Sequence, residues 1–201
     1  MGELIDGFGR EVTYMRISVT DKCNLRCVYC MPEEGVKARA HDEMLTMEEF
    51  ARIVHVAATL GISRVRITGG EPLARKGAVS LVRAVARVPG VCDISMTTNA
   101  TMLAPVADEL AGAGLKRVNI SLDSLNPDTY ARLTRRGDLA SAIAGIHAAQ
   151  RAGLSPIRLN AVVLSGINSD EIESLAALTL KHAWDVRFIE FMPFWGNGGL
   201  F

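Results

Sequence analysis

The stretch Met15-Arg-Ile-Ser-Val-Thr-Asp-Lys-Cys-Asn-Leu-Arg-Cys-Val-Tyr-Cys30 joins an alternating apolar segment to three closely spaced cysteines. Its first part, Met15–Val19, alternates apolar and polar side chains, which is typical of a β-strand. Cys23, Cys27 and Cys30 follow on the connection that leaves this strand. Because ligands of parallel α/β proteins bind beyond the carboxyl ends of the strands, the stretch predicts both a fold class and the position of a site.

Further segments downstream repeat the strand-like pattern, and apolar residues at helical spacing lie between them. The predicted strands are Met15–Val19, Arg64–Thr68, Asp93–Thr97, Arg117–Ser121, Ile157–Val163 and Asp185–Phe191. The predicted helices are Met47–Leu60, Ala78–Val88, Ala104–Ala113, Leu139–Ala152 and Asp170–His182. Repeated strand and helix units predict an α/β fold with parallel strands and right-handed crossovers. We expect a partial TIM-type (β/α)6 barrel formed by one domain, residues 1–201.

Local signals mark several of the helix ends. Thr46 and Glu49 form the capping-box pattern that begins a helix. Gly61, Gly114 and Gly153 each follow a predicted helix, at the place where a left-handed residue commonly ends it. We therefore expect all three glycines to have left-handed backbone conformations.

The composition argues against several classes of protein. Lys plus Arg and Asp plus Glu each total 22, so the formal net charge is zero and no general attraction for nucleic acid or a membrane surface is expected. The first residues are acidic and Gly-rich, unlike a signal peptide, and no apolar run reaches membrane-spanning length. We therefore expect a cytoplasmic protein.

Polar, Gly-rich or otherwise unusual residues follow five of the predicted strands. Because parallel strands end at the same edge of a sheet, these residues should face one shared cleft. They are Thr20–Cys30, Gly69–Pro72, Thr97–Asn99, Ser121–Ser124 and Met192–Pro193.

The three clustered cysteines suit a metal centre. Three thiolates leave one iron of a 4Fe-4S cluster open to a small cofactor. A structural zinc site would need a fourth ligand, for which His41 is the nearest downstream candidate, and a disulfide would leave one cysteine over. The spacing favours an iron-sulfur cluster over zinc. Cys92 stands apart, and we expect it to be a buried structural thiol.

Two motifs together carry a resemblance to a known family. The sequence Cys23-Asn-Leu-Arg-Cys-Val-Tyr-Cys30 matches the CxxxCxxC signature of the radical S-adenosylmethionine superfamily, including the aromatic residue before the third cysteine. Gly69-Gly-Glu-Pro72 resembles the GGEP segment of that family, whose backbone meets the amino group of the methionine moiety. Alone, GGEP is an ordinary tight turn and Tyr29 an ordinary packing aromatic. Together they identify the chain as a member of the superfamily.

Within the superfamily, the sequence resembles the GTP 3′,8-cyclases of molybdenum cofactor biosynthesis over nearly its whole length. The similar segments are Leu4–Arg10, Tyr14–Asp21, Arg66–Pro72, Met96–Asn99, Val118–Ser124, Arg132–Arg136 and Arg187–Pro193. The resemblance implies a 4Fe-4S cluster on Cys23, Cys27 and Cys30. It also implies contacts with S-adenosylmethionine by Tyr29, Gly70, Ser121 and Met192, and contacts with GTP by Arg16, Arg66, Thr97 and Arg158.

The resemblance further implies a lyase in which a 5′-deoxyadenosyl radical abstracts hydrogen from GTP. Its partners would be GTP as substrate, an external electron donor and a downstream pterin synthase, with no nucleic acid and no membrane. No catalytic acid or base is identified, because Glu71, Asp123 and Glu190 are expected to be structural hydrogen-bond partners.

Two features depart from the family pattern. Arg158 stands where the family usually has Lys, which keeps the charge but changes the geometry. The family also continues into a C-terminal segment whose three further cysteines bind a second cluster, and this sequence lacks that segment. We therefore expect cleavage of S-adenosylmethionine with little cyclisation. The alternatives are a catalytically uncoupled fragment, a radical enzyme for another substrate, and a non-catalytic metal-binding module.

Overall fold

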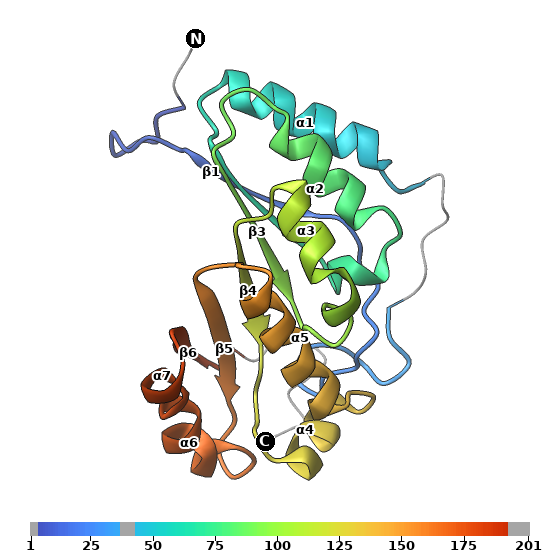
Figure 1. Cartoon of the computed structure of the whole chain (residues 1–201), viewed down its shortest axis with the longest axis vertical. Coiled ribbons are helices and arrows are strands. Elements are labelled where there is room, and N and C mark those ends of the chain that lie inside the picture. The colour runs from blue at the N-terminus through green and yellow to red at the C-terminus, as the bar shows by residue number, and fades with distance from the viewer. Residues whose placement is uncertain (1–3, 37–42, 193–201) are drawn as a thin grey trace.

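The computed structural model describes residues 4–36 and 43–192 (Figure 1). In these residues, one open sheet contains six parallel strands that neighbour one another in chain order. The strands are β1 (Tyr14–Ser18), β2 (Arg64–Thr68), β3 (Asp93–Thr98), β4 (Arg117–Ser121), β5 (Ile157–Val163) and β6 (Trp184–Glu190). This arrangement confirms the predicted parallel (β/α)6 partial barrel.

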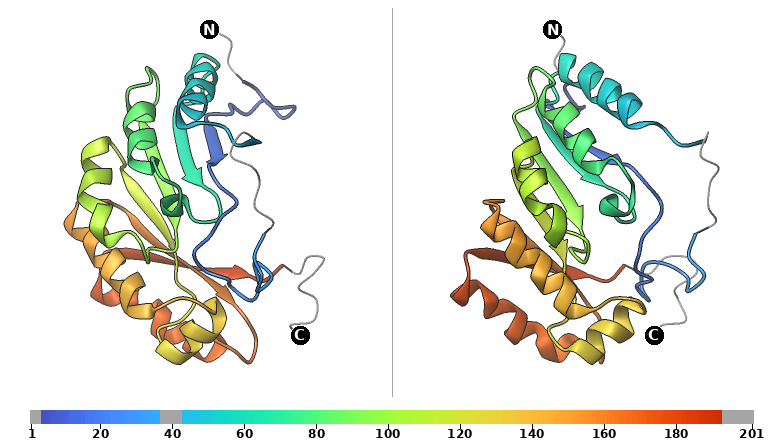
Figure 2. Two further views of the ribbon diagram at one scale, coloured as in Figure 1. Left: turned by 90° about the vertical axis from the view of Figure 1, so that its right-hand side faces the viewer. Right: turned by 45° about the vertical axis from the view of Figure 1, so that its right-hand side comes forward.

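The helices lie along one face of the sheet (Figure 2). They are α1 (Met47–Thr59), α2 (Ala78–Ala86), α3 (Ala107–Ala113), α4 (Pro127–Thr134), α5 (Leu139–Arg151), α6 (Ile172–Ala176) and α7 (Leu178–Lys181). Short 3-10 turns precede three of them: η2 (Pro72–Ala74), η3 (Ala104–Val106) and η4 (Ser169–Glu171). A sequential strand order with right-handed crossovers places every connection on the same side, so the opposite face curves around a concave surface. No described helix has the length and apolar character needed to cross a membrane.

The strand pattern explains how the two faces differ. On β2 and β4, the residues Val65, Ile67, Val118 and Ile120 are buried and pack in the core between sheet and helices. Since successive side chains of a strand point to opposite faces, the residues between them face the concave side. This alternation therefore places the polar residues of the strands on the concave face.

The predicted helix ends are confirmed. The Thr46 hydroxyl accepts a hydrogen bond from the Glu49 N–H at 3.2 Å, and the Glu49 carboxylate accepts one from the Thr46 N–H at 2.7 Å. Gly61, Gly114 and Gly153 have φ values of 101°, 112° and 76°. These signals depend only on neighbouring residues, which explains why the sequence alone was sufficient to place them.

One helical prediction was wrong, and one helix was not predicted. The single helix predicted over 170–182 is divided into η4, α6 and α7, with Ala177 between the last two. Helix α4 was not predicted, although its start carries a recognisable signal. The Asn126 side chain accepts hydrogen bonds from the N–H groups of Asp128 and Thr129, and Pro127 occupies the first turn, where its missing N–H costs nothing.

The close approach of α5 to the loop after β3 gives a test of the packing. A Cβ atom on Gly145 would lie 2.1 Å from the carbonyl oxygen of Ala100, whereas one on Gly112 of α3 would meet nothing within 4 Å. We predict that Gly145→Ala lowers the free energy of unfolding by about 1–3 kcal/mol through overpacking. Gly112→Ala should raise it by roughly 0.5–1 kcal/mol, because alanine favours the helix. Urea unfolding of both variants measures the two effects, and equal stability would contradict the packing described here.

Candidate functional site

The cysteine loop is attached to the sheet by direct contact between two backbones. The Gly70 N–H donates a hydrogen bond to the Thr20 carbonyl at 2.7 Å, and the Glu71 N–H donates one to the Lys22 carbonyl at 2.8 Å. A Cβ atom on Gly69 would lie 2.5 Å from the Thr20 oxygen, and one on Gly70 would lie 2.4 Å from the Lys22 oxygen. The two glycines are therefore required because the loop leaves no space for side chains.

Glu71 holds the ends of two strands together. Its side chain is fully buried, with one carboxylate oxygen accepting from the Leu73 N–H at 3.0 Å and the Thr98 hydroxyl at 2.8 Å. The second oxygen accepts from the Asn99 N–H at 2.7 Å. Burial raises the pKa of Glu71, and these hydrogen bonds act in the opposite direction. The expected structural role of Glu71 agrees with this arrangement.

Asn99 extends this network to the first cysteine. Its side-chain nitrogen donates to the Asn24 side-chain oxygen at 2.9 Å and contacts the Cys23 sulfur at 3.8 Å. The Leu25 N–H also donates to that sulfur, at 3.4 Å. The Asn99 oxygen accepts from the Thr101 hydroxyl at 2.7 Å. Asn99 thus positions the start of the cysteine loop. The sequence predicted only that Asn99 faces the shared cleft at a strand end.

Asp123 attaches the far end of the loop to β4 and β5. Its side chain is 3% exposed; one oxygen accepts from the Tyr29 hydroxyl at 2.7 Å and the other from the Val162 N–H at 2.9 Å. Burial raises the pKa of Asp123, while these two hydrogen bonds act to lower it. Burial, followed by the charge of Asp123, raises the pKa of Tyr29.

The three thiols lie on one loop in a free state. Cys23 and Cys27 are partly buried and Cys30 is exposed. Burial raises the pKa of all three, to about 12 for Cys27. The charge of Asp123 raises the pKa of Cys27 and Cys30 further, and the Cys30 charge raises those of Cys23 and Cys27. The thiols are therefore within electrostatic range of one another and are protonated near neutral pH.

Their arrangement bears on which metal centre they suit. In residues 4–36 and 43–192, no three His, Cys, Asp or Glu side chains converge as needed to hold a single metal ion. Three thiolates on one loop would leave one iron of a 4Fe-4S cluster without a protein ligand. The donor set and the N–H group directed at Cys23 fit such a cluster. The zinc alternative relied on His41, which lies outside the described residues.

Cys92 differs from its predicted environment. It is exposed rather than buried, and it lies immediately before β3, at the amino edge of the sheet. Its sulfur approaches the Ser63 carbonyl oxygen at 3.4 Å. The expectation of a buried thiol was wrong because the residue belongs to the loop and not to the strand.

The concave face carries a group of arginines. Arg16 and Arg66 are register partners on β1 and β2, and the Arg66 side chain donates a hydrogen bond to the Ser95 hydroxyl at 3.3 Å. Burial lowers the pKa of Arg66, and the charges of Arg16, Arg117 and Arg158 lower it further. The structure therefore brings three predicted arginines together and adds Arg117, which sequence reasoning missed.

Two of these arginines have acidic partners. Arg117 pairs with Asp93 at 2.5 Å, and Arg158 pairs with Asp185 at 3.1 Å. Arg66 makes no ion pair with the described residues, and its side chain donates its hydrogen bond to the neutral Ser95 hydroxyl. The concave face thus keeps uncompensated positive charge, which suits an anionic ligand.

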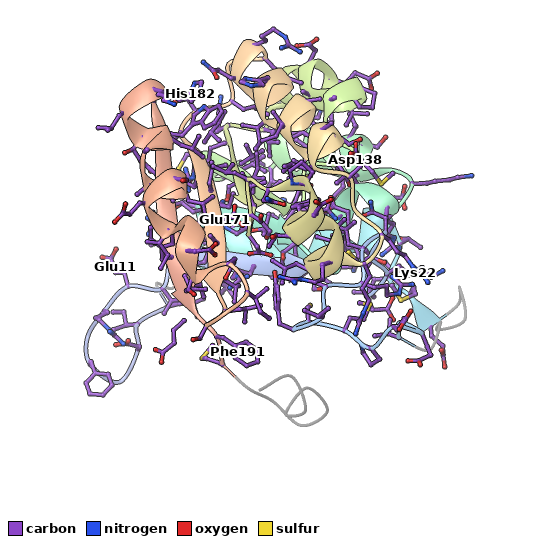
Figure 3. The ribbon with its side chains drawn as sticks, turned by 90° about the horizontal axis from the view of Figure 1, so that it is seen from below. Glu11, Lys22, Asp138, Glu171, His182 and Phe191 are labelled. Carbon is purple, nitrogen blue, oxygen red and sulfur yellow. The ribbon has the colours of Figure 1, made fainter. Side chains whose placement is uncertain are left out.

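The remaining predicted residues lie along the same edge of the sheet. Thr97 on β3 and Ser121 at the end of β4 are partly buried, whereas Met192 follows β6 with 77% of its surface exposed. Viewed from below, Lys22 of the cysteine loop and Phe191 beside Met192 both lie lower in the view than Asp138, the N-cap of α5, and His182, the C-cap of α7 (Figure 3). Met192 is therefore much more exposed than Thr97 or Ser121.

A parallel partial barrel with a three-cysteine loop beyond its first strand defines a class of metal-cofactor enzymes. The sequence profile of the Radical SAM superfamily matches residues 17–179, and the chain belongs to this superfamily. Curated relatives named GTP 3′,8-cyclase include those of Peptoclostridium acidaminophilum, 53% identical over 191 residues, and Moorella thermoacetica, 52% identical over 188 residues. These alignments cover 95% and 94% of this chain but only 59% and 58% of the relatives.

Solved structures show the same fold at low sequence identity. Streptococcus suis SuiB bound to S-adenosylmethionine has a TM-score of 0.75 at 21% identity, covering 92% of this chain and 42% of that one. Methylornithine synthase has a TM-score of 0.71 at 18% identity, covering 91% and 54%. At these sequence identities, the similarity to the solved structures establishes the fold alone.

The two buried carboxylates should respond differently to neutral replacement. Each Glu71 oxygen faces a backbone N–H, so Glu71→Gln must place its NH₂ against a donor and should lower the free energy of unfolding by about 1–3 kcal/mol. In Asp123→Asn one oxygen can still face the Val162 N–H, while the NH₂ meets a Tyr29 hydroxyl that can accept. Asp123→Asn should therefore stay within about 1 kcal/mol of wild type at pH 7.

The pH dependence provides a second measurement. Because burial raises the pKa of Asp123 on folding, the folded wild type binds more protons than the unfolded chain. The stability that Asp123 gains from this raised pKa is fully present below the pKa of the unfolded chain. It is lost as the pH rises through the pKa of the folded protein. The stability of Asp123→Asn relative to wild type should thus increase as the pH rises above about 4, the usual pKa of an aspartate, in urea unfolding. A decrease over this range would contradict the assignment.

Proposed function

We propose that this chain is the radical-generating core of a GTP 3′,8-cyclase, acting in the first step of molybdenum cofactor biosynthesis. The observation that carries the proposal is the arginine group on the sheet face whose carboxyl edge holds the cysteine loop. Sequence identity above 50% to relatives named GTP 3′,8-cyclase supports GTP as the substrate. We propose one radical SAM core domain over residues 1–201, located in the cytoplasm.

The cysteine loop supplies the proposed cluster ligands Cys23, Cys27 and Cys30. When bound, a 4Fe-4S cluster with one open iron supplies the electron that cleaves S-adenosylmethionine to methionine and a 5′-deoxyadenosyl radical. Loading requires the three thiols to lose their protons, so cluster assembly should release protons and weaken as the pH falls.

The proposed cofactor contacts are Tyr29, Gly70, Ser121 and Met192. The N–H of Gly70 is already donated to Thr20, so contact with the ammonium group of the cofactor would use backbone carbonyl oxygens of this turn. The Tyr29 hydroxyl is held by Asp123, which leaves the aromatic ring as its contacting surface. These hydrogen bonds fix both residues before the cofactor binds, which reduces the entropy lost on binding.

The proposed substrate contacts are Arg16, Arg66, Thr97 and Arg158. Guanidinium groups offer planar pairs of donors that match phosphate oxygens. Arg66 is the strongest candidate, because burial and three neighbouring arginines lower its pKa and an incoming triphosphate would relieve their repulsion. Arg158 reaches the same anion only in competition with Asp185. The abstraction of hydrogen from GTP then depends on holding the ribose near the radical carbon.

The proposed reaction also requires partners. An external electron donor would reduce the cluster, and a pterin synthase would consume the product. The chain spans about 59% of the length of its curated relatives. A second candidate function is cleavage of S-adenosylmethionine without cyclisation of GTP.

The cluster assignment predicts a specific loss of colour. Replacing Cys23, Cys27 or Cys30 singly by Ala should abolish the brown chromophore after anaerobic reconstitution, because the remaining thiols cannot complete the ligand set. Cys92→Ala is the matched control and should keep it, since this exposed thiol lies at the opposite edge of the sheet. Visible absorption and iron content measure the outcome. A complete spectrum in all three loop variants would refute the assignment.

The arginine assignment predicts separate effects on two ligands. Arg16→Ala and Arg66→Ala should each weaken GTP binding by about 1.5–3 kcal/mol, the value of a charge-assisted contact, and change S-adenosylmethionine binding little. Arg52→Ala on the exposed surface of α1 is the control. Calorimetric titration of both ligands decides the matter, and equal weakening of both would indicate a collapsed pocket.

The proposed function is tested by measuring 5′-deoxyadenosine and cyclised nucleotide together, with dithionite under anaerobic conditions. We expect the chain to produce 5′-deoxyadenosine and little cyclised product. Cyclisation requires the ribose of GTP to lie close to the radical carbon, and a displacement of about 1 Å between them can cost a hundredfold in rate. One-to-one formation of both products would show that this chain suffices for cyclisation. Absence of 5′-deoxyadenosine would reject both candidate functions.

A further inference from the structure

Asn119 is a buried amide whose hydrogen-bonding groups are unused. It lies in the middle of β4, is 1% exposed, and has no partner for its side-chain nitrogen or oxygen among the described residues. The neighbouring Val118 and Ile120 pack in the core between sheet and helices, so alternation directs Asn119 to the concave face. Buried polar groups are usually paired, and one left unpaired destabilises the fold.

The register of the sheet places Asn119 between two proposed substrate contacts. Asn119 is the direct partner of Thr97 on β3 and of Arg158 on β5. Neighbouring strands lie about 4.8 Å apart, so the three side chains form one row across the concave face. A ligand that contacts both Thr97 and Arg158 must therefore pass over Asn119.

The position along β4 indicates which part of the ligand lies there. Arg117, Asn119 and Ser121 point to the same face, and successive members of this series are about 6–7 Å apart along the strand. Arg117 belongs to the arginine group, while Ser121 is a proposed cofactor contact. Asn119 thus lies one step nearer to Ser121 than Arg117 does, in the row that it shares with Arg158. In a nucleotide, the sugar is the part that joins the phosphates to the rest of the molecule.

We propose that Asn119 binds a ribose hydroxyl of the nucleotide substrate, an inference that rests on the proposed function. A hydroxyl both donates and accepts hydrogen bonds, so one hydroxyl can accept from the amide NH₂ and donate to the amide oxygen. A phosphate group accepts only, and would leave the amide oxygen facing an anion. The chemistry of the unpaired amide therefore favours the sugar over the phosphates.

The test compares Asn119→Leu, which is similar in size and apolar, with wild type. The probes are GTP, its 2′-deoxy and 3′-deoxy analogues, and inorganic tripolyphosphate, each titrated against the anaerobically reconstituted chain. Wild type should bind GTP at least about tenfold more tightly than one deoxy analogue. Asn119→Leu should bind GTP about as weakly as wild type binds that analogue. The variant should bind the analogue no more weakly than it binds GTP, and it should bind tripolyphosphate as tightly as wild type does.

Thermal unfolding without ligand provides an independent readout. Because the replacement removes two unpaired buried groups, Asn119→Leu should melt at the same temperature as wild type or higher. The inference would be overturned, and Asn119 would be a structural residue, if Asn119→Leu melted at a lower temperature and bound all probes more weakly to the same extent. Failure of both Asn119→Leu and Asn119→Ala to fold would have the same meaning. An unchanged affinity of Asn119→Leu for GTP, or an equal loss of affinity for tripolyphosphate, would also overturn the inference. If wild type binds tripolyphosphate but does not prefer GTP, the proposed function itself fails.

Discussion

The contact between the Gly69–Gly70 turn and the backbone of Thr20–Lys22 determines where the cysteine loop lies. Two hydrogen bonds join the segments, and their separation leaves no room for a Cβ atom on either glycine. Because the turn is itself held by the buried Glu71, the loop is fixed to the ends of β2 and β3 rather than to a single strand. A metal site on a loop is precise only when its supports are rigid, and this contact provides the rigidity.

Asp123 supplies the second attachment, and its charge has an electrostatic consequence. Burial, followed by the charge of Asp123, raises the pKa of Cys27 and Cys30 and so favours their protonated forms. The hydrogen bonds to Tyr29 and Val162 show why the residue is nevertheless suited to this place, since they join the loop to β5. The same side chain thus stabilises the geometry of the site and disfavours the thiolates, an opposition common where function and stability compete.

The concave face combines charge with unused polar groups. The charges of Arg16, Arg117 and Arg158 act on Arg66, and the amide of Asn119 lies on the same face without a partner among the described residues. Arg117 and Arg158 have acidic partners, whereas Arg66 has no ion pair among the described residues and both polar atoms of the Asn119 amide are unpaired there. Their location on the face opposite the hydrophobic core supports the proposal that they bind the substrate, because core residues of the same strands are fully apolar.

The sequence alone determined the features that depend on neighbouring residues. Strand alternation gave all six strands within one residue at either end, and the caps at Thr46 and Gly61 were correct, because these signals operate over a few positions. The break at Ala177 and the exposure of Cys92 were missed, since packing decides them. Only the tertiary structure could add Arg117 to the arginine group or place Asn119 between Thr97 and Arg158. Register joins residues far apart in the chain, and no local pattern records which residues become neighbours across a sheet.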